Sequence, residues 1–174
     1  MADSTLPPGG KAERLAREAE GYFELELWPE ALARAEALDR EGLIPEAAGR
    51  LRAECLRNLG RFAEAIPVYE RILADRPADS GAWVGLGWCR KRTGRLDLAV
   101  AAMESLVAAC PGEPIGSYNL ACYLSLAGEP ERAVQCLERA IAMAPDFRRL
   151  AREESDFDPL RSDPAFRKLT EEEA

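Results

Sequence analysis

The chain of 174 residues contains no histidine, and its five cysteines include no C-x-x-C pair. Zinc sites are built from histidine and closely spaced cysteine ligands, so we expect no metal and no cofactor. Without histidine, base catalysis would fall to carboxylates or a cysteine, and no glycine-rich phosphate loop follows a strand pattern. We therefore expect no catalytic residue. The alternative is that the protein is an enzyme in which the thiol of Cys122 is the reactive group.

Long apolar runs are also missing. No stretch of about 18 apolar residues occurs, which predicts that no helix spans a membrane. The N-terminus lacks a basic start followed by an apolar stretch, so residues 1–11 are predicted to be a flexible leader and not a secretory signal. An odd number of cysteines is a poor disulfide framework, which favours the cytoplasm. The ratio of 20 arginines to 3 lysines points to a bacterial source.

What the sequence does contain is a repeat with a period of 34 residues. Four residue types recur at this interval: Gly60, Gly94 and Gly128; Ala65, Ala99 and Ala133; Glu70, Glu104 and Glu138; and Pro77, Pro111 and Pro145. A period of this length predicts a solenoid, in which each unit buries its apolar face by stacking on its neighbours. Such an architecture favours a binding surface over a reaction centre.

The clearest unit predicts two helices, over residues 82–93 and 96–109. Gly94 is expected to end the first helix, because glycine adopts the left-handed conformation that often follows a helix end. Pro111 follows the second helix, which it cannot continue. The small residues Gly87 and Ala99 should let the two helices approach closely.

These positions resemble the tetratricopeptide repeat. The residues that match its pattern in place are Trp83, Leu86, Gly87, Ala99 and Pro111. Met103 stands where phenylalanine is usual, and Arg90 replaces the usual tyrosine. The resemblance implies an all-α fold, a right-handed α-solenoid of four helix pairs with capping helices at the C-terminus.

The repeats are expected to divide the chain into five parts after the leader: residues 12–45, 46–79, 80–113 and 114–147, and a C-terminal cap over 148–174. Within the cap, a helix near Leu150 should cover the edge of the fourth repeat. An extended piece anchored by Phe157 and Leu160 should follow, and then a short helix that Pro164 opens. This closing stretch looks like that of many bacterial tetratricopeptide proteins.

In the family, the first helix of each pair lines a concave groove. Carrying the groove positions over to this sequence gives a candidate peptide-binding set: Arg50, Glu54, Arg57, Asn58, Trp88, Lys91, Arg92, Tyr118, Asn119 and Cys122. This set is basic and aromatic although the chain has a net charge of −8. The hypothesis is that it binds an extended peptide with acidic groups. The alternative is that these charges only solvate a helix face.

The resemblance therefore implies a protein or peptide partner, and an adaptor or scaffold is the leading interpretation. A dedicated chaperone for one secreted or assembled bacterial partner is the alternative among binding proteins. A net charge of −8 argues against nucleic acid, because phosphate binding needs a positive field. Self-association is a further possibility, in which the acidic first repeat would dock on another molecule's groove.

Overall fold

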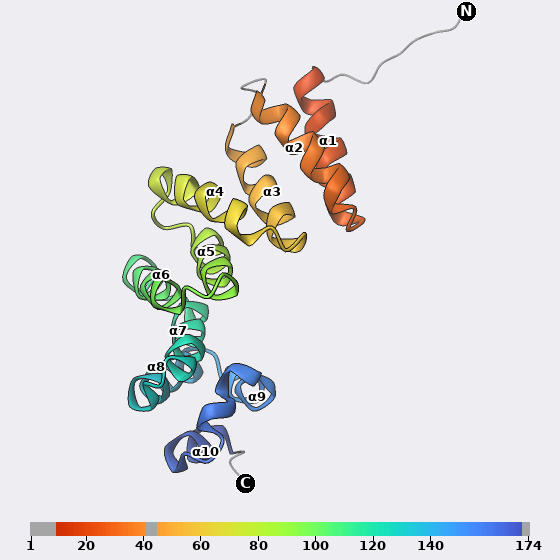
Figure 1. The fold of residues 1–174 in the computed structure, drawn as a ribbon. Coiled ribbons are helices and arrows are strands. Elements are labelled where there is room, and N and C mark those ends of the chain that lie inside the picture. The colour runs from red at the N-terminus through yellow and green to blue at the C-terminus, as the bar shows by residue number, and fades with distance from the viewer. Residues whose placement is uncertain (1–9, 41–44, 172–174) are drawn as a thin grey trace, which may run out of the picture. The chain divides into compact units, whose positions relative to one another are not determined.

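The computed structural model describes residues 10–40 and 45–171. Within these ranges the chain forms helices joined by turns and no strand, so the predicted all-α fold is confirmed (Figure 1). The contacts divide the chain into two compact units, one up to Ile72 and the other from Leu73 onward. Apart from Gly10 and Lys11, the predicted leader lies outside the described residues.

The N-terminal unit consists of paired helices that pack on one another. It contains α1 (Lys11–Glu24), α2 (Trp28–Arg40), α3 (Pro45–Asn58) and most of α4 (Phe62–Asp75), inside which the boundary between the units falls. Helix α2 packs on both α1 and α3, and α1 also contacts α3. We call the first helix of each pair, α1 and α3 here, an A helix and its follower a B helix.

The C-terminal unit continues the same pattern and then changes. Two more pairs come first, α5 (Ser80–Arg92) with α6 (Leu96–Ala109) and α7 (Pro114–Leu126) with α8 (Pro130–Met143). Three short elements follow, α9 (Phe147–Glu153), the 3-10 helix η1 (Ser155–Leu160) and α10 (Pro164–Thr170). Helix α7 packs on α5, α6 and α8, as expected for stacked pairs of a solenoid. The helices predicted over 82–93 and 96–109 are confirmed to within two residues.

The repeated glycines end the A helices in one recurring turn. Gly94 has a φ of 76°, and the amide of the residue after it donates to the carbonyl of Arg90 at 2.9 Å. This bond from the amide after the left-handed residue back into the last turn is the Schellman cap. In the first pair Glu26 takes the glycine's place with a φ of 59°, and the following amide donates to Tyr22 at 2.9 Å. The turn is therefore kept even where its favoured residue is missing.

The repeated alanines pack at the interfaces between helices. All of them are fully buried: Ala31, Ala65, Ala99 and Ala133. Gly87 of α5 is needed for the same reason, because a Cβ atom there would lie 2.7 Å from Cε of Met103 on α6. The prediction that small residues let the two helices approach closely is confirmed.

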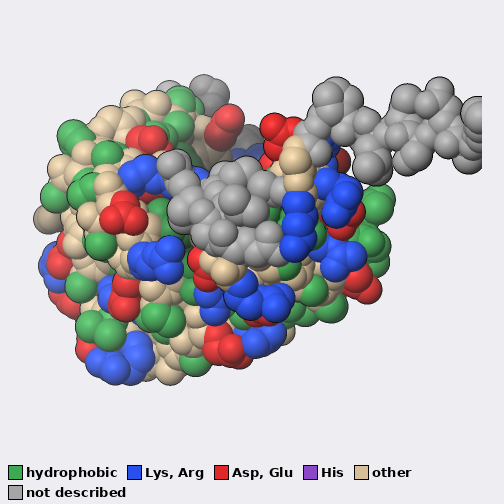
Figure 2. All heavy atoms as spheres, turned by 90° about the horizontal axis from the view of Figure 1, so that it is seen from above, with side chains coloured by type: hydrophobic (Ala, Val, Ile, Leu, Met, Phe, Trp, Pro, Cys, Tyr) green, Lys and Arg blue, Asp and Glu red, His purple; other side chains and the backbone are tan. Residues whose placement is uncertain are grey.

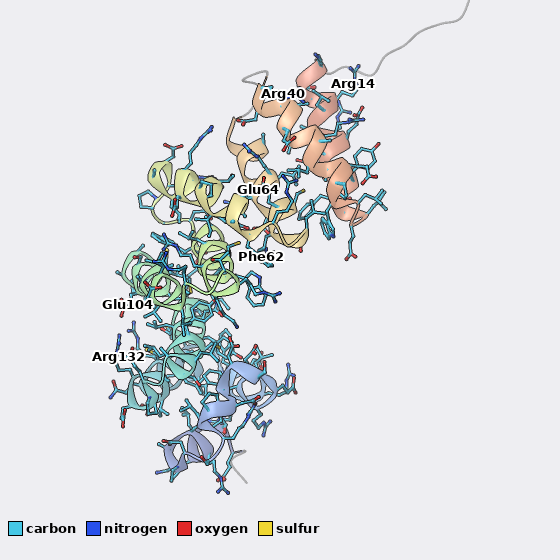
Figure 3. The ribbon with its side chains drawn as sticks, in the orientation of Figure 1. Arg14, Arg40, Phe62, Glu64, Glu104 and Arg132 are labelled. Atoms are coloured by element: carbon cyan, nitrogen blue, oxygen red, sulfur yellow. The ribbon has the colours of Figure 1, made fainter. Side chains whose placement is uncertain are left out.

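Charged pairs link the B helices on their exposed side. Arg132 at the start of α8 donates to Glu104 of α6 at 2.7 Å and to Glu129 at 2.5 Å (Figure 3). Both Arg132 and Glu104 are about half exposed, so these contacts add little to the free energy of folding. The face visible in Figure 2 likewise mixes Lys and Arg with Asp and Glu side chains. Among the described residues, no helix combines the length and the apolar character needed to cross a bilayer.

One element of the cap differs from the prediction. The segment expected to be extended forms the 3-10 helix η1, so that expectation was wrong. The Glu154 side chain accepts a hydrogen bond from the amide of Asp156, which starts the helix, and Pro159 has a φ that helices tolerate. Phe157 and Leu160 are buried, at 0% and 4% exposure, as anchors should be.

Candidate functional site

The N-terminal unit contains an open pocket of about 240 Å³ on the side of its A helices. Its apolar lining comes from α1, α2 and α3: Ala16, Phe23, Leu38, Ala48 and Leu51. Three charged side chains complete it, Glu20 from α1 and Arg50 and Glu54 from α3. We call this set the N-terminal pocket. Two of the ten predicted groove residues, Arg50 and Glu54, thus lie on its wall.

Glu54 is held in a fixed position by a small polar network. Arg57 donates to one carboxylate oxygen at 2.5 Å, and the hydroxyl of Tyr69 donates to the other at 2.8 Å. The side-chain Nδ2 of Asn58 donates to the backbone carbonyl of Glu54 at 3.0 Å. The Nε atom of Arg57 is buried and has no hydrogen-bond partner among the described residues. A buried donor of this kind is costly unless an acceptor reaches it.

A second group of predicted residues lies on α5 in the C-terminal unit. Trp88 is 37% exposed, and the guanidinium of Arg92 lies 5.8 Å from the centre of its ring. The ammonium of Lys91 lies 5.2 Å from the same ring and 5.6 Å from that of Tyr123. Both cations are therefore within reach of a favourable interaction with the indole face. Lys91 also forms an ion pair with Asp156 of η1.

The predicted residues of α7 are largely covered. Tyr118 is 7% exposed, stacks on Phe147 with ring centres 4.5 Å apart and meets Phe157 edge-on at 5.8 Å. Cys122 is 2% exposed. Asn119 is half-buried. Because the cap lies over Tyr118, a separate peptide has no access to its ring in this conformation.

Burial also determines the chemistry of the cysteines. It raises the pKa of the Cys122 thiol, and the charges of Asp156 and Glu154 raise it further. Burial, together with the charge of Glu54, raises the pKa of Cys55 to about 11. Both thiols are held protonated at neutral pH, the opposite of an activated nucleophile. The described residues contain no group of three His, Cys, Asp or Glu side chains that could hold a metal ion. These sites therefore provide apolar surface bordered by charged side chains, which suits binding.

The sequence reasoning missed two features of these sites. It did not anticipate a pocket between α1 and α3, whose apolar lining depends on how two helices pack. It also missed Asp156 as the partner of Lys91. A signal for the second was present, since the hypothesis asked for an acidic segment and residues 154–160 read ESDFDPL.

Comparison with protein families gives two matches. A model described as tetratricopeptide repeat matches residues 16–80 and 50–114, and a second model with the same description matches residues 117–147. Together they span most of the chain. No curated protein matches it.

Several solved structures are similar. YrrB, described as a TPR protein with an unusual peptide-binding site, has a TM-score of 0.73 at 23% identity, covering 83% of this chain and 75% of that chain. MamA from residue 41 to its end, from Desulfovibrio magneticus RS-1, has a TM-score of 0.73 at 19% identity, covering 94% and 95%. The Yersinia enterocolitica type III secretion chaperone SycD, in complex with a peptide of the translocator YopD, has a TM-score of 0.55 at 26% identity, covering 63% and 86%.

Proposed function

Because the chain belongs to the tetratricopeptide repeat family, we propose that it is a protein–protein interaction module that binds an extended acidic peptide along its A helices. It acts as an adaptor or scaffold and is not an enzyme. Its free cysteines and its excess of arginine over lysine fit the cytoplasm of a bacterium. A net charge of −8 makes nucleic acid an unfavourable partner.

The observation that carries this proposal is the N-terminal pocket. Binding sites are typically concave and apolar, with a few polar groups that fix the orientation of the ligand. Phe23 and Leu51 supply apolar surface, and Glu20, Arg50 and Glu54 supply the charges. The volume of about 240 Å³ falls below the range of about 300–1,000 Å³ usual for small-molecule sites. It suits one aliphatic or aromatic side chain, which would anchor a longer peptide.

Arginine supports the preference for acidic peptides. Arg50 lies at the pocket, and Arg57 lies two turns further along α3 with its buried Nε atom lacking an acceptor among the described residues. Carboxylates form strong bonds with guanidinium groups, so an Asp or Glu beside the anchor would pair with Arg50. Trp88 and Arg92 of the C-terminal unit form a further exposed patch of the same chemistry.

The similar proteins agree with this reading. YrrB is described by its peptide-binding site, and the SycD structure holds a peptide of its translocator. Both are thus described with a peptide, and we propose peptide binding for this chain as well.

A dedicated chaperone is the second candidate, and the similarity to SycD at 26% identity favours it. The two functions differ in the partners that they predict. A chaperone would co-purify in equal amounts with one protein that is degraded when the chaperone gene is deleted. An adaptor would co-purify with several partners in smaller amounts, and these would survive its deletion.

The direct test is selection of binders from a library of random short peptides displayed on phage. We expect the selected peptides to share one aliphatic or aromatic residue flanked by Asp or Glu. Affinities of the selected peptides can then be measured by fluorescence anisotropy. In these measurements Ala16→Leu, which fills the pocket, should weaken binding by about tenfold or more. Arg57→Glu should weaken the acidic peptides selectively.

The matched control is Ala33→Leu, the same change at an exposed position of α2 in the same unit. It should leave both the affinity and the melting temperature unchanged. If the library yields no binder, the proposed function is wrong. If binders appear and Ala16→Leu does not affect them, the pocket is not the anchor site.

A further inference from the structure

The A-helix face of the C-terminal unit already holds a peptide segment, and that segment belongs to the same chain. Residues 154–160, which we call the tail segment, pack through η1 against α7. We call the C-terminal wall the surface formed by Trp88 and Lys91 of α5 and by Tyr118, Cys122 and Ser125 of α7. The tail segment contacts this wall at Lys91 and Tyr118. The tail segment therefore lies on the face where family members are expected to bind peptides.

The contacts between the tail segment and the wall have the character of peptide recognition. Asp156 forms an ion pair with Lys91, whose side chain is 19% exposed. Phe157 is fully buried and meets the ring of Tyr118 edge-on at 5.8 Å. One charged pair and one buried aromatic anchor are the usual centre of a binding interface. The tail segment also matches the acidic ligand that the sequence of the wall predicts.

The tail segment is held by the wall and by its own cap, where Arg161 donates to the carbonyls of Glu154 at 2.8 Å and Ala151 at 3.1 Å. As a six-residue 3-10 helix, η1 has poorer hydrogen-bond geometry than an α-helix. Its ends are closed by long backbone bonds, from Phe157 to Glu154 at 3.2 Å and from Arg161 to Asp158 at 3.3 Å. Its position therefore rests on the wall and on Phe166 of α10, whose ring lies 5.3 Å from that of Phe157.

The wall also extends beyond what the tail segment satisfies. Ser125 lies one turn after Cys122 on α7, and its buried hydroxyl has no hydrogen-bond partner among the described residues. On α5, the indole of Trp88 remains 37% exposed beside Lys91. A segment from another protein could contact both the covered and the exposed part.

We propose that the C-terminal wall is a second peptide site and that the tail segment is its intramolecular ligand. When the tail segment leaves, the wall binds in trans a peptide of another protein with an acidic residue, an aromatic residue, a second acidic residue, proline and an aliphatic residue in that order. The tail segment thereby competes with the partner and sets a threshold for its binding. This inference rests on the proposed function, because it concerns the regulation of peptide binding on the A helices of the C-terminal unit, but it does not depend on the N-terminal pocket.

The first measurement uses the wild-type chain and a maleimide reagent. Cys122 and Cys89 are both buried in the C-terminal unit, at 2% and 0% exposure, but only Cys122 belongs to the wall. If the tail segment opens locally, Cys122 should react about tenfold or more faster than Cys89. Equal rates, set by unfolding of the whole unit, would overturn the proposal.

The second measurement uses the full-length variant with Asp156→Asn and Phe157→Ala, which weakens the tail segment. The probe is the fluorescein-labelled peptide EESDFDPLRS, which corresponds to residues 153–162. The variant should bind this peptide about tenfold or more tightly than the wild type does. Adding Lys91→Glu should remove the gain, and Ala33→Leu at an exposed position of the other unit should leave it unchanged. The bound peptide should slow labelling of Cys122 and not of the half-exposed Cys110.

Several outcomes would overturn the proposal. One is a folded variant that binds the peptide no better than the wild type. Another is a gain in affinity over the wild type that persists after Lys91→Glu. A third is a variant that loses its helical circular dichroism, because the tail segment would then be an inseparable part of the core. Failure of the phage selection described above would leave this result untouched, so the two proposals can be separated.

Discussion

Gly94 and Glu26 occupy the same position in two turns of the same kind, with φ values of 76° and 59°. Glycine adopts this conformation without strain, whereas a residue with a Cβ atom loses about 1 kcal/mol there. Nothing lies within 4 Å of a Cβ atom built at Gly94, so the loss would come from the backbone alone. We expect Gly94→Ala to lower the free energy of unfolding by about 1 kcal/mol, measured by urea denaturation.

Gly112→Ala is the matched control, because a Cβ atom there also meets nothing and its φ lies outside the left-handed region. It should leave the stability equal or slightly higher, since alanine reduces the freedom of the unfolded chain. The reverse change, Glu26→Gly, should not destabilise the N-terminal unit. If Gly94→Ala and Gly112→Ala shift the urea midpoint equally, the turn geometry is not what Gly94 supplies.

At the scale of elements, the residues that recur every 34 positions were sufficient to predict the helices of the repeats. They were not sufficient to predict the conformation of the tail segment. Gly94 and Pro111 act on their own neighbours, so local chemistry determined where α5 and α6 end. The tail segment was predicted as an extended piece anchored by Phe157 and Leu160, but it forms a 3-10 helix. Its actual form depends on Lys91 and Tyr118, which are distant in sequence, so no local pattern could reveal it. The positions of Arg57 and Glu54 on α3 were likewise predictable, but their mutual ion pair was not.

Helix α10 depends on its N-cap, because a helix of seven residues has little stability by itself. The side chain of Asp163 accepts hydrogen bonds from the amides of Ala165 at 2.8 Å and Phe166 at 3.1 Å. We expect Asp163→Ala to destabilise the C-terminal unit by about 1 kcal/mol, measured by thermal denaturation. Because Phe166 of α10 contacts Phe157 at 5.3 Å, the same change should also speed maleimide labelling of Cys122.

Asp163→Ser provides the control, since serine keeps an acceptor at the N-cap. It should restore most of the melting temperature and of the protection of Cys122. If Asp163→Ala lowers the melting temperature but does not speed the labelling of Cys122, α10 does not support the tail segment.

For the whole molecule, the division into two units places the two candidate sites on separate parts of the chain. The N-terminal pocket is open and rests on α1, α2 and α3. The C-terminal wall rests on α5 and α7 and is covered by the chain's own tail segment. We therefore propose that the predicted groove residues are split between a site available to a partner and a site that must first be released. One chain of this design would bind one peptide readily and a second one only conditionally.

The net charge of −8 makes a last prediction about how an acidic peptide reaches the N-terminal pocket. At long range the acidic protein repels such a peptide, whereas Arg50 and Arg57 attract it only after contact. Salt screens this long-range repulsion, with a screening length of about 10 Å at 0.1 M. The association rate should therefore rise as the salt concentration increases from about 20 to 200 mM. The dissociation rate should rise as well, because the arginine contacts are weakened. Stopped-flow fluorescence with a peptide selected on phage measures both rates, and Arg57→Gln should reduce the salt dependence of dissociation. An association rate that falls steeply with salt would instead mean that a positive surface steers the peptide from a distance, contrary to this view of the molecule.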